Sequence, residues 1–314
     1  MNAKPRIADK ERKAARKTPA AWSIGIYTGA TLFDLHPARE VQNPVVCAKN
    51  VSDCDAEFVA DPFMIKSGDT WHMFFEVMDA ETEKGVIGLA TSNNGLAWDY
   101  QRIVLSEPFH LSYPHVFELD GEYYMIPESY QANAIRLYRG DPFPNLWRPV
   151  TDLMTGAWVD ASIFRFKDRW WMFTSPYSQE NDSLCLFYSE SVAGPWHGHA
   201  MNPIVERNSK MARPGGRVTV LGDQIIRFTQ DCYPYYGRLV RAFEISELTT
   251  SAYVEREADR SPVLIPGAEA WRRSGMHHLD PHFVDNRWLA CVDGWQHETR
   301  IYLPTADGAL KDAQ

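Results

Sequence analysis

Acidic residues recur at one spacing along this chain of 314 residues. Glu76 follows Asp61 by fifteen residues, and Glu128 follows Tyr113 by the same interval. A third segment of this kind opens at Asp160. When carboxylates gather away from water they repel one another, so some of their pKa values rise and the set divides into acids and bases. Glycoside cleavage requires such a pair of carboxyl groups, and the spacing favours that chemistry.

Each interval encloses two short apolar runs around a turn, which predicts a β-hairpin. The predicted turns lie at residues 68–69, 120–121, 167–168, 222–223 and 285–286. Behind the first hairpin, further strands are predicted at residues 85–92 and 94–98. The units recur at 52, 47, about 53 and about 67 residues, a pattern typical of propellers with four-stranded blades. We therefore predict an all-β protein, a five-bladed β-propeller of four-stranded antiparallel blades.

The last predicted blade is short of a strand, because only residues 300–303 remain as an evident strand after the fifth hairpin. Residues 22–27 can supply the missing strand. Closure by strands from both termini would remove exposed sheet edges. We predict a single propeller domain at residues 21–314, preceded by a basic disordered tail at residues 1–20.

Charge and composition exclude several classes of partner. The formal net charge is −9, and the first 20 residues hold seven Lys/Arg against two Asp/Glu, so the body is strongly acidic. Such a body repels a phosphate backbone, and nucleic acid is not a predicted partner. No apolar run approaches the roughly 18 residues of a membrane span, and no signal-peptide pattern is present, which predicts a cytoplasmic protein. The five cysteines contain no C-x-x-C pair, so neither a disulfide framework nor a thiolate zinc site is predicted.

The same position in every blade of a propeller faces one shared axis, so the candidate site can be taken column by column. The predicted catalytic residues are Asp61, Asp160 and Glu128, because carboxyl groups gathered on one axis can divide into acid and base. The predicted substrate-binding residues are Glu76, Tyr113, His115, Arg213, Gln230, Asp231, His278 and Asp280. Arg213 and the two glycines after it suit an anionic group of the substrate.

Several of these residues also have a simpler structural interpretation. Asp-Pro and Asp-Gly pairs also shape strand entries and turns, and Arg213–Gly216 can be a simple turn. His277, His278 and His282 have the chemistry of metal ligands, but neighbours on a strand point to opposite faces. No metal or cofactor is therefore predicted. The aromatic residues of the return strands are predicted to pack between blades rather than to bind sugars.

Six short motifs carry a resemblance to a known family: Ala60–Met64, Tyr113–Phe117, Pro127–Ser129, Trp158–Ser162, Arg213–Gly216 and Gln230–Cys232. Together they resemble the N-terminal domain of plant glucosamine inositolphosphorylceramide transferases, which also occurs in bacterial proteins. The resemblance runs from Trp22 onward. In the plant proteins, sugar transfer is attributed to a separate C-terminal glycosyltransferase domain.

That domain is in turn similar to the five-bladed propellers of glycoside hydrolase families 43, 32 and 68. Their first-blade inner-strand Asp is the base or nucleophile, a role the resemblance implies for Asp61, and a third-blade Glu is the acid. This chain departs from that pattern at two positions. Asp160 stands at the third-blade position, and Tyr113, two residues before His115, replaces the second-blade Asp that modulates the pKa of the acid.

Two functions remain open from the sequence. The first is a glycoside hydrolase-like enzyme that cleaves or transfers a glycosyl unit in the biosynthesis of an intracellular glycan, glycolipid or metabolite. The second is a non-catalytic propeller that binds a glycan or a glycolipid headgroup. In both cases the expected partner is a carbohydrate or a sugar-containing small molecule.

Overall fold

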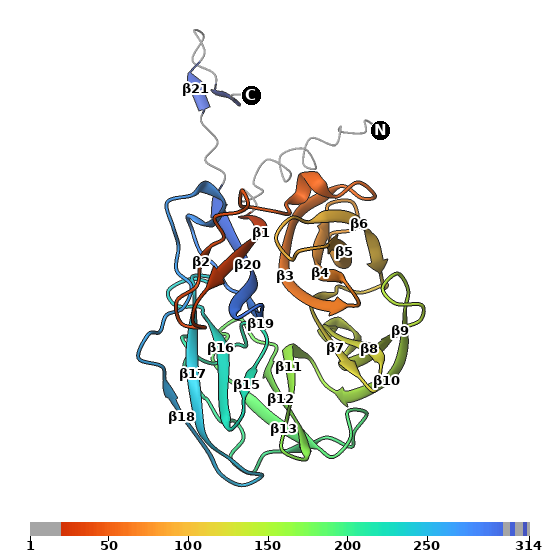
Figure 1. The fold of residues 1–314 in the computed structure, drawn as a ribbon, viewed down its shortest axis with the longest axis vertical. Helices are drawn as coiled ribbons and strands as arrows, with labels where there is room; N and C mark the ends of the chain where they lie inside the picture. Colours follow the sequence, from red (N-terminus) through yellow and green to blue (C-terminus); the bar gives the residue numbers. More distant parts are fainter. Residues whose placement is uncertain (1–19, 298–301, 305–309, 313–314) are drawn as a thin grey trace, which may run out of the picture.

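Five four-stranded antiparallel sheets surround a common axis in the computed structural model (Figure 1). The structure describes residues 20–297, 302–304 and 310–312. Beside the strands it contains three single-turn 3₁₀ helices, at Ala48–Asn50, Tyr130–Ala132 and Ala270–Arg272. The predicted five-bladed β-propeller is confirmed.

The blades follow one another along the chain, each running from the axis outward. Blade 1 comprises β3 (Ala56–Ser67), β4 (Thr70–Asp79), β5 (Lys84–Ser92) and β6 (Asp99–Leu105). Blade 2 comprises β7 (Ser112–Leu119), β8 (Glu122–Glu128), β9 (Ala134–Gly140) and β10 (Trp147–Thr155). Blade 3 comprises β11 (Trp158–Phe166), β12 (Arg169–Pro176), β13 (Cys185–Ser189) and β14 (His197–Gly198). Blade 4 comprises β15 (Thr219–Leu221), β16 (Gln224–Asp231), β17 (Leu239–Leu248) and β18 (Tyr253–Glu257).

Blade 5 takes its two outer strands from the N-terminal part of the chain. Its order is β19 (Leu279–Val284), β20 (Arg287–His297), β1 (Ala20–Gly29) and β2 (His36–Pro37). The strand predicted at residues 22–27 therefore closes the ring as expected. The strand predicted at residues 300–303 lies partly outside the described residues. Its described part belongs to β21 (Tyr302–Pro304), which pairs with β22 (Leu310–Asp312) in a separate two-stranded sheet.

All five predicted hairpin turns are confirmed, because each lies between the first two strands of a blade. The strand predicted at residues 94–98 is wrong. The Ser92 hydroxyl accepts a hydrogen bond from the Gly95 N–H, and the Asn94 side chain accepts two more from Leu96 and Ala97. These local bonds replace a strand ladder, and β6 starts only at Asp99.

Apolar side chains fill the spaces between blades. Phe74 of blade 1 meets Trp147 of blade 2 edge to face, with ring centroids 5.2 Å apart. Trp170 of blade 3 lies 5.8 Å from Phe117 of blade 2. Of the return-strand aromatics predicted to pack, Phe74, Trp170, Trp171, Phe173 and Trp288 are buried, whereas Tyr124 is half-buried and stacks on Phe117. In the described ranges, no helix is long and apolar enough to cross a bilayer.

One buried ion pair joins several blades near the axis. The Arg217 Nε donates to Asp280 Oδ1 at 2.5 Å, and its Nη2 donates to the Val116 carbonyl of blade 2 at 2.9 Å. The other oxygen of Asp280 accepts the Met64 N–H of blade 1 at 2.7 Å. This pair therefore holds the inner strands of three blades to the segment that precedes β15.

Replacing Arg217 by Leu should destabilise the fold by about 3–5 kcal/mol, because Asp280 would remain buried with its principal counter-charge removed. The free energy of unfolding measured in urea tests this. Arg287→Leu is the matched control, since Arg287 pairs with Glu40 on the surface and its loss should cost at most about 1 kcal/mol. Equal effects of the two substitutions would contradict the structural role of Arg217.

Candidate active site on the propeller axis

The inner strands of blades 1, 2 and 3 share one backbone irregularity. Asp61, Tyr113 and Asp160 have φ values of 53°, 45° and 53°, in the left-handed region. Each lies at a β-bulge, where the pairing with the next strand shifts its register. Such backbone costs of order 1–3 kcal/mol per residue and is concentrated at functional sites. A bulge also re-aims the side chain, and the repeated strain marks this position as the candidate site.

Carboxyl groups from four blades gather there, all of them buried. Glu76 and Glu128 stand on the return strands opposite Ala60 and Ser112, the residues just before the bulges. The five carboxyl residues at these strand ends are at most 6% exposed: Asp61, Glu76, Glu128, Asp160 and Asp293. The fifteen-residue spacing of the sequence therefore places acids side by side at one end of the propeller axis.

Arg213 compensates one part of this negative charge. Its Nε donates to Asp160 Oδ2 at 2.5 Å, and its Nη1 donates to Asn181 Oδ1 at 2.8 Å. Gln230 Nε2 donates to the same oxygen of Asp160 at 2.9 Å. Arg213 Nη2 also lies 3.6 Å from Glu128 Oε2. Asp160 is thus held in an ion pair and oriented by an amide.

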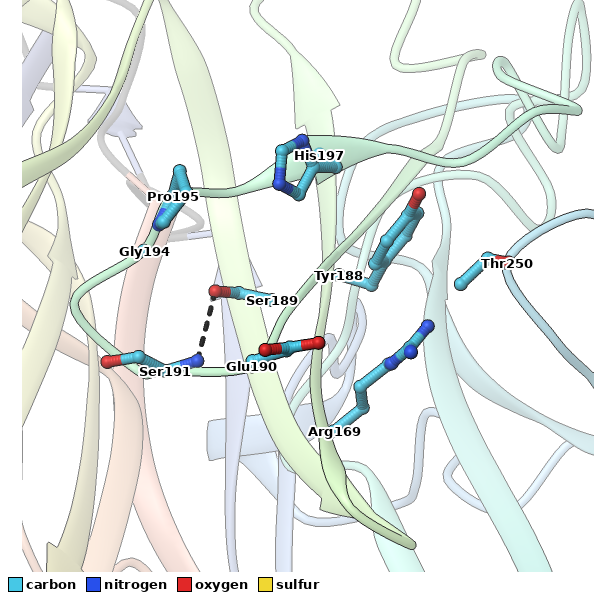
Figure 2. A pocket seen from close by; sticks show the side chains of 9 residues that line it. All are labelled: Arg169, Tyr188, Ser189, Glu190, Ser191, Gly194, Pro195, His197 and Thr250. Atoms are coloured by element: carbon cyan, nitrogen blue, oxygen red, sulfur yellow. Dashed lines mark hydrogen bonds between the residues drawn. The ribbon is translucent and has the colours of Figure 1, made fainter.

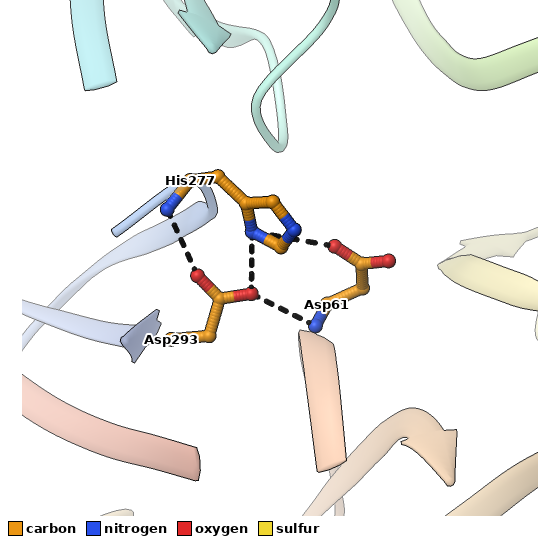
Figure 3. Close-up of side chains that lie close together, drawn as sticks. All are labelled: Asp61, His277 and Asp293. Atoms are coloured by element: carbon orange, nitrogen blue, oxygen red, sulfur yellow. Dashed lines mark hydrogen bonds and ion pairs between the residues drawn. The ribbon is translucent and has the colours of Figure 1, made fainter. Parts of the chain in front are cut away.

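His277 compensates a second part (Figure 3). Its Nδ1 lies 2.8 Å from Asp293 Oδ2 and 3.8 Å from Asp61 Oδ1. Asp293 is fixed from three sides, because it accepts backbone N–H groups of Asp61, His277 and His278 at 3.0–3.1 Å. Burial alone would lower the pKa of His277, but Asp293 and then Asp61 outweigh it and raise that pKa. Asp293 in turn has a lowered pKa, since His277 outweighs the effect of burial.

The remaining acids are pushed toward the neutral form. Burial raises the pKa of Asp61 to about 7, with His277 opposing and Asp293 adding to the shift. Burial, and after it the neighbouring carboxylates, raise the pKa of Glu76 and of Glu128 well above the usual range. The site therefore combines a carboxyl group that titrates near neutral pH with two that keep their protons, the separation that acid–base catalysis uses.

Two carboxyl oxygens are left without hydrogen-bond partners among the described residues. They are Asp61 Oδ1 and Glu128 Oε2, both buried. The cationic or imidazole nitrogens nearest to them stand at 3.6–3.8 Å, beyond hydrogen-bond distance. An unpaired buried polar atom is costly, so each of these two oxygens is available to bond a ligand or a water.

The atoms that could hold a metal are Asp61 Oδ1, His277 Nδ1 and Asp293 Oδ2, which all lie within 4.8 Å of one another. This mixed nitrogen and oxygen set suits several divalent ions. In the structure, however, the Nδ1 of His277 forms an ion pair with Asp293. A metal would have to displace the His277 proton that this pair uses.

Aromatic side chains form the surroundings of the site. Trp22, at the start of β1, stacks on His277 with centroids 3.9 Å apart and planes 22° apart. Tyr236, 41% exposed, covers the guanidinium of Arg213 at 5.1 Å. On another side, Tyr130 and Tyr177 stack at 4.3 Å with planes 8° apart. Glu128 acts electrostatically on Tyr130, so this second stack stands close to the acids.

Several of the predicted substrate-binding residues lie outside the group of buried carboxyl residues. The hydroxyl of Tyr113 is bonded to Ser162 and to the backbone of Gly216, deep on the axis. His115 lies 3.4 Å from Arg217 and Asp280 is paired with Arg217. Both belong to the ion-pair group described above.

Asp231 lies apart from the acids, whereas His278 lies beside Asp61. Asp231 accepts from Arg241 and Arg238 on the side of blade 4. His278 is fully buried with its Nδ1 3.7 Å from Asp61, and burial lowers its pKa to about 4. Of the predicted residues, the structure brings together Asp61, Glu76, Glu128, Asp160, Arg213, Gln230 and His278.

The prediction missed residues that the repeat does not mark. Trp22 precedes the first hairpin, and Tyr130, Tyr177 and Tyr236 lie in connections between strands. Arg217 was also missed. It stands only four residues after Arg213, and this proximity in the sequence could have indicated a second cation near the propeller axis.

The fold and the acid-lined axis define a five-bladed β-propeller whose polar site lies where the inner strands begin. Residues 15–295 match the family described as "Glucosamine inositolphosphorylceramide transferase 1, N-terminal". The chain belongs to this family. It is 34% identical over 302 residues to glucosamine inositolphosphorylceramide transferase 1 of Oryza sativa subsp. japonica, and 34% identical over 296 residues to that of Arabidopsis thaliana. These alignments cover 87% of this chain but only 40% and 39% of the plant proteins.

Solved structures with a similar fold include proteins named as glycoside hydrolases. An exo-1,5-alpha-L-arabinanase from a bovine ruminal metagenomic library has a TM-score of 0.56 at 13% identity, covering 76% of this chain and 91% of that one. The catalytic domain of a GH62 alpha-L-arabinofuranosidase from Coprinopsis cinerea has a TM-score of 0.57 at 11% identity, covering 88% and 98%. At 11–13% identity, these similarities show a shared fold and nothing more.

The raised pKa of Asp61 makes stability depend on pH. The folded protein keeps the Asp61 proton up to about pH 7, whereas the unfolded chain releases it near the ordinary aspartate pKa of 3.8. Wild type should therefore lose up to about 4 kcal/mol between these pH values. Asp61→Asn removes this loss, so its advantage over wild type should grow with pH across that window in urea unfolding. Ser175→Ala, a buried neighbour without a carboxyl group, is the control. Parallel curves for wild type and Asp61→Asn would contradict the shift.

Proposed function

We propose that this propeller is a carbohydrate-active enzyme that cleaves or transfers a glycosyl unit. The proposal assigns the nucleophile or base to Asp61 and the acid to Glu128. The observation that supports it best is the pair of buried oxygens, one on each of these residues, that accept no hydrogen bond within the described chain. Both residues also have raised pKa values.

Asp160 is the less suitable acid. Its Oδ2 accepts from both Arg213 and Gln230, so a proton on that oxygen would compete with two donors. Glu128 lies beside it with a free oxygen and a pKa well above the usual range. We therefore assign Asp160 the role of holding Arg213, and Glu128 the role of the proton donor.

The proposed reaction follows from these protonation states. Protonated Glu128 gives its proton to the glycosidic oxygen as the bond from that oxygen to the anomeric carbon breaks. Ionised Asp61 either attacks the anomeric carbon or removes a proton from an attacking water or acceptor hydroxyl. The His277 cation, with its Nδ1 3.8 Å from Asp61 Oδ1, stabilises the ionised form of Asp61.

The substrate class is also part of the proposal. The curated relatives are named for glucosamine and inositolphosphorylceramide, and the chain spans about two fifths of their length. The two solved neighbours are named as an exo-1,5-alpha-L-arabinanase and an alpha-L-arabinofuranosidase. We infer a glycan or a glycolipid headgroup as the substrate. The aromatic rings around the site suit sugar faces, since rings of this type pack against apolar C–H groups.

A second candidate is a non-catalytic propeller that binds the same class of ligand. One observation favours it: the inner-strand positions of blades 2 and 3 are committed to structural contacts, Tyr113 to Gly216 and Asp160 to Arg213. Under this alternative the buried acids would serve as hydrogen-bond partners for ligand hydroxyls.

Turnover of a panel of aryl glycosides, oligosaccharides and nucleotide sugars distinguishes the two candidates. Asp61→Asn and Glu128→Gln should each lower kcat/KM by about 100-fold or more, because each removes a proton-transfer group. Asp152→Asn, which changes an exposed ion pair with Arg136, should leave the rate near that of wild type. No turnover by wild type, with a saccharide still raising the melting temperature, would support the binding protein instead.

The stacked tyrosines should bind the part of the substrate on the leaving-group side, because they stand beside the proposed acid Glu128. Tyr177→Ala should raise KM about tenfold for an extended glycoside, since burying the apolar C–H face of a sugar against the ring contributes about 1–1.5 kcal/mol at roughly 25 cal/mol per Å². It should leave the rate with a glycosyl fluoride, which carries no second ring, close to wild type. Similar losses with both substrates would exclude this role for the stack.

A further inference from the structure

A second hollow lies between the outer parts of blades 3 and 4 (Figure 2). Its volume is about 530 Å³, within the usual range for ligand pockets, and residues of β12, β13, the loop after β13 and the β17–β18 turn line it. A smaller hollow of about 350 Å³ adjoins it, and the two share Arg169 and Thr250. Together they form one cleft.

This cleft is on the opposite face of the propeller from the acids. Arg169 pairs with Phe166 at the turn of the first hairpin of blade 3, whereas Val159, next to Asp160, pairs with Ser175 at the other end. Six residues of strand separate Asp160 from Phe166, which corresponds to roughly 20 Å. The cleft is therefore independent of the axial site.

The charged side chains of the larger hollow are unpaired. The side chains of Arg169, Glu190 and His197 make no hydrogen bond or ion pair with any residue in the described part of the chain. Figure 2 shows Arg169 and Glu190 directed into the same space with no bond between them. Arg169 lies 5.6 Å from the ring of Tyr188, and His197 lies 5.7 Å from the same ring. Donors and acceptors thus surround an aromatic side chain.

The walls of the cleft are held by internal hydrogen bonds. In the loop after β13, the Ser191 N–H donates to Ser189 Oγ at 3.2 Å, and the Trp196 indole donates to the Val192 carbonyl at 3.2 Å. On the other side, a ring nitrogen of His199 bonds the Thr249 carbonyl at 2.7 Å. That bond ties blade 3 to the β17–β18 turn of blade 4. A pocket formed before binding loses little entropy when a ligand enters.

The lining indicates what kind of ligand fits. Lys167 and Arg169 are balanced by Asp168 and Glu190, so the cleft favours neither an anion nor a cation. Carboxylates accept from hydroxyl groups and guanidinium donates to them, and Tyr188, half-buried beside Arg169, adds an aromatic side chain to the lining. We propose that this cleft is a second saccharide-binding site, which takes a neutral polyhydroxylated chain on the face opposite to the acids.

Saturation-transfer NMR and calorimetry with maltohexaose, cellohexaose, xylohexaose and arabinohexaose test the proposal on the full chain. The background is Asp61→Asn, so that turnover cannot remove the probe. Adding Arg169→Ala with Glu190→Ala should weaken binding of at least one probe by about tenfold or more, since hydrogen bonds to charged groups contribute about 1.5–3 kcal/mol each. Arg165→Ala with Glu206→Ala removes two exposed charges outside the cleft and should leave affinity unchanged.

Three outcomes would overturn the proposal. The first is that none of the four probes binds. The second is binding that the Arg169/Glu190 pair of substitutions leaves unchanged, which would place the saccharide elsewhere, including the axial site. The third is an equal loss with the Arg165/Glu206 control, which would indicate a general effect of surface charge. Failure of the axial acids to catalyse anything would not affect these results, because the two sites are tested by different variants.

Discussion

The constraint on which the site depends is the burial of five carboxyl groups around one axis. Unpaired, they could not all ionise, because each buried charge both loses water and repels the others. The chain meets this constraint with two cations, Arg213 on Asp160 and His277 on Asp293. The other three acids, Asp61, Glu76 and Glu128, have raised pKa values instead. Division into ionised and protonated carboxyl groups is thus a consequence of packing, and it is the condition that general acid–base chemistry requires.

The strand pairing that closes the ring also positions residues of the site. The strand β1 pairs along the whole of β20, and this seam brings Trp22 onto His277 and Asp293 to the backbone of Asp61. Arg213, from the segment before β15, reaches acids of blades 2 and 3. The pairs of Arg213 cross from one blade to another, and the pair of His277 with Asp293 in blade 5 reaches Asp61 of blade 1, so the site cannot form in any blade alone. Removing either partner of one of these ion pairs should therefore lower the free energy of unfolding and also impair the site.

The repeat in the sequence was sufficient to predict the five hairpins and the strand ends that meet on the axis, because hairpin turns and alternating apolar runs are local signals. It could not decide the direction of adjacent side chains. Gln230 reaches Asp160 while Asp231 turns to Arg241, since neighbours on a strand face opposite sides. Asp280 looked like a counterpart of Asp61, yet β19 has no bulge and its carboxylate is paired with Arg217. Such outcomes depend on cross-blade partners far apart in sequence.

The short side chain at Asp160 has consequences beyond its own position. In the glycoside hydrolase pattern that the sequence resembles, this strand end carries the acid, which must be free to lose and regain a proton. Here Arg213 and Gln230 both donate to one oxygen of Asp160, so that oxygen is a fixed acceptor. A carboxyl group whose pKa burial and then Asp160 raise well above the usual range lies one blade away, at Glu128, and its Oε2 is near the same guanidinium. If the propeller acts on glycosides, its proton donor therefore approaches the leaving group from blade 2, and the sugar must be oriented differently from one whose acid comes from blade 3.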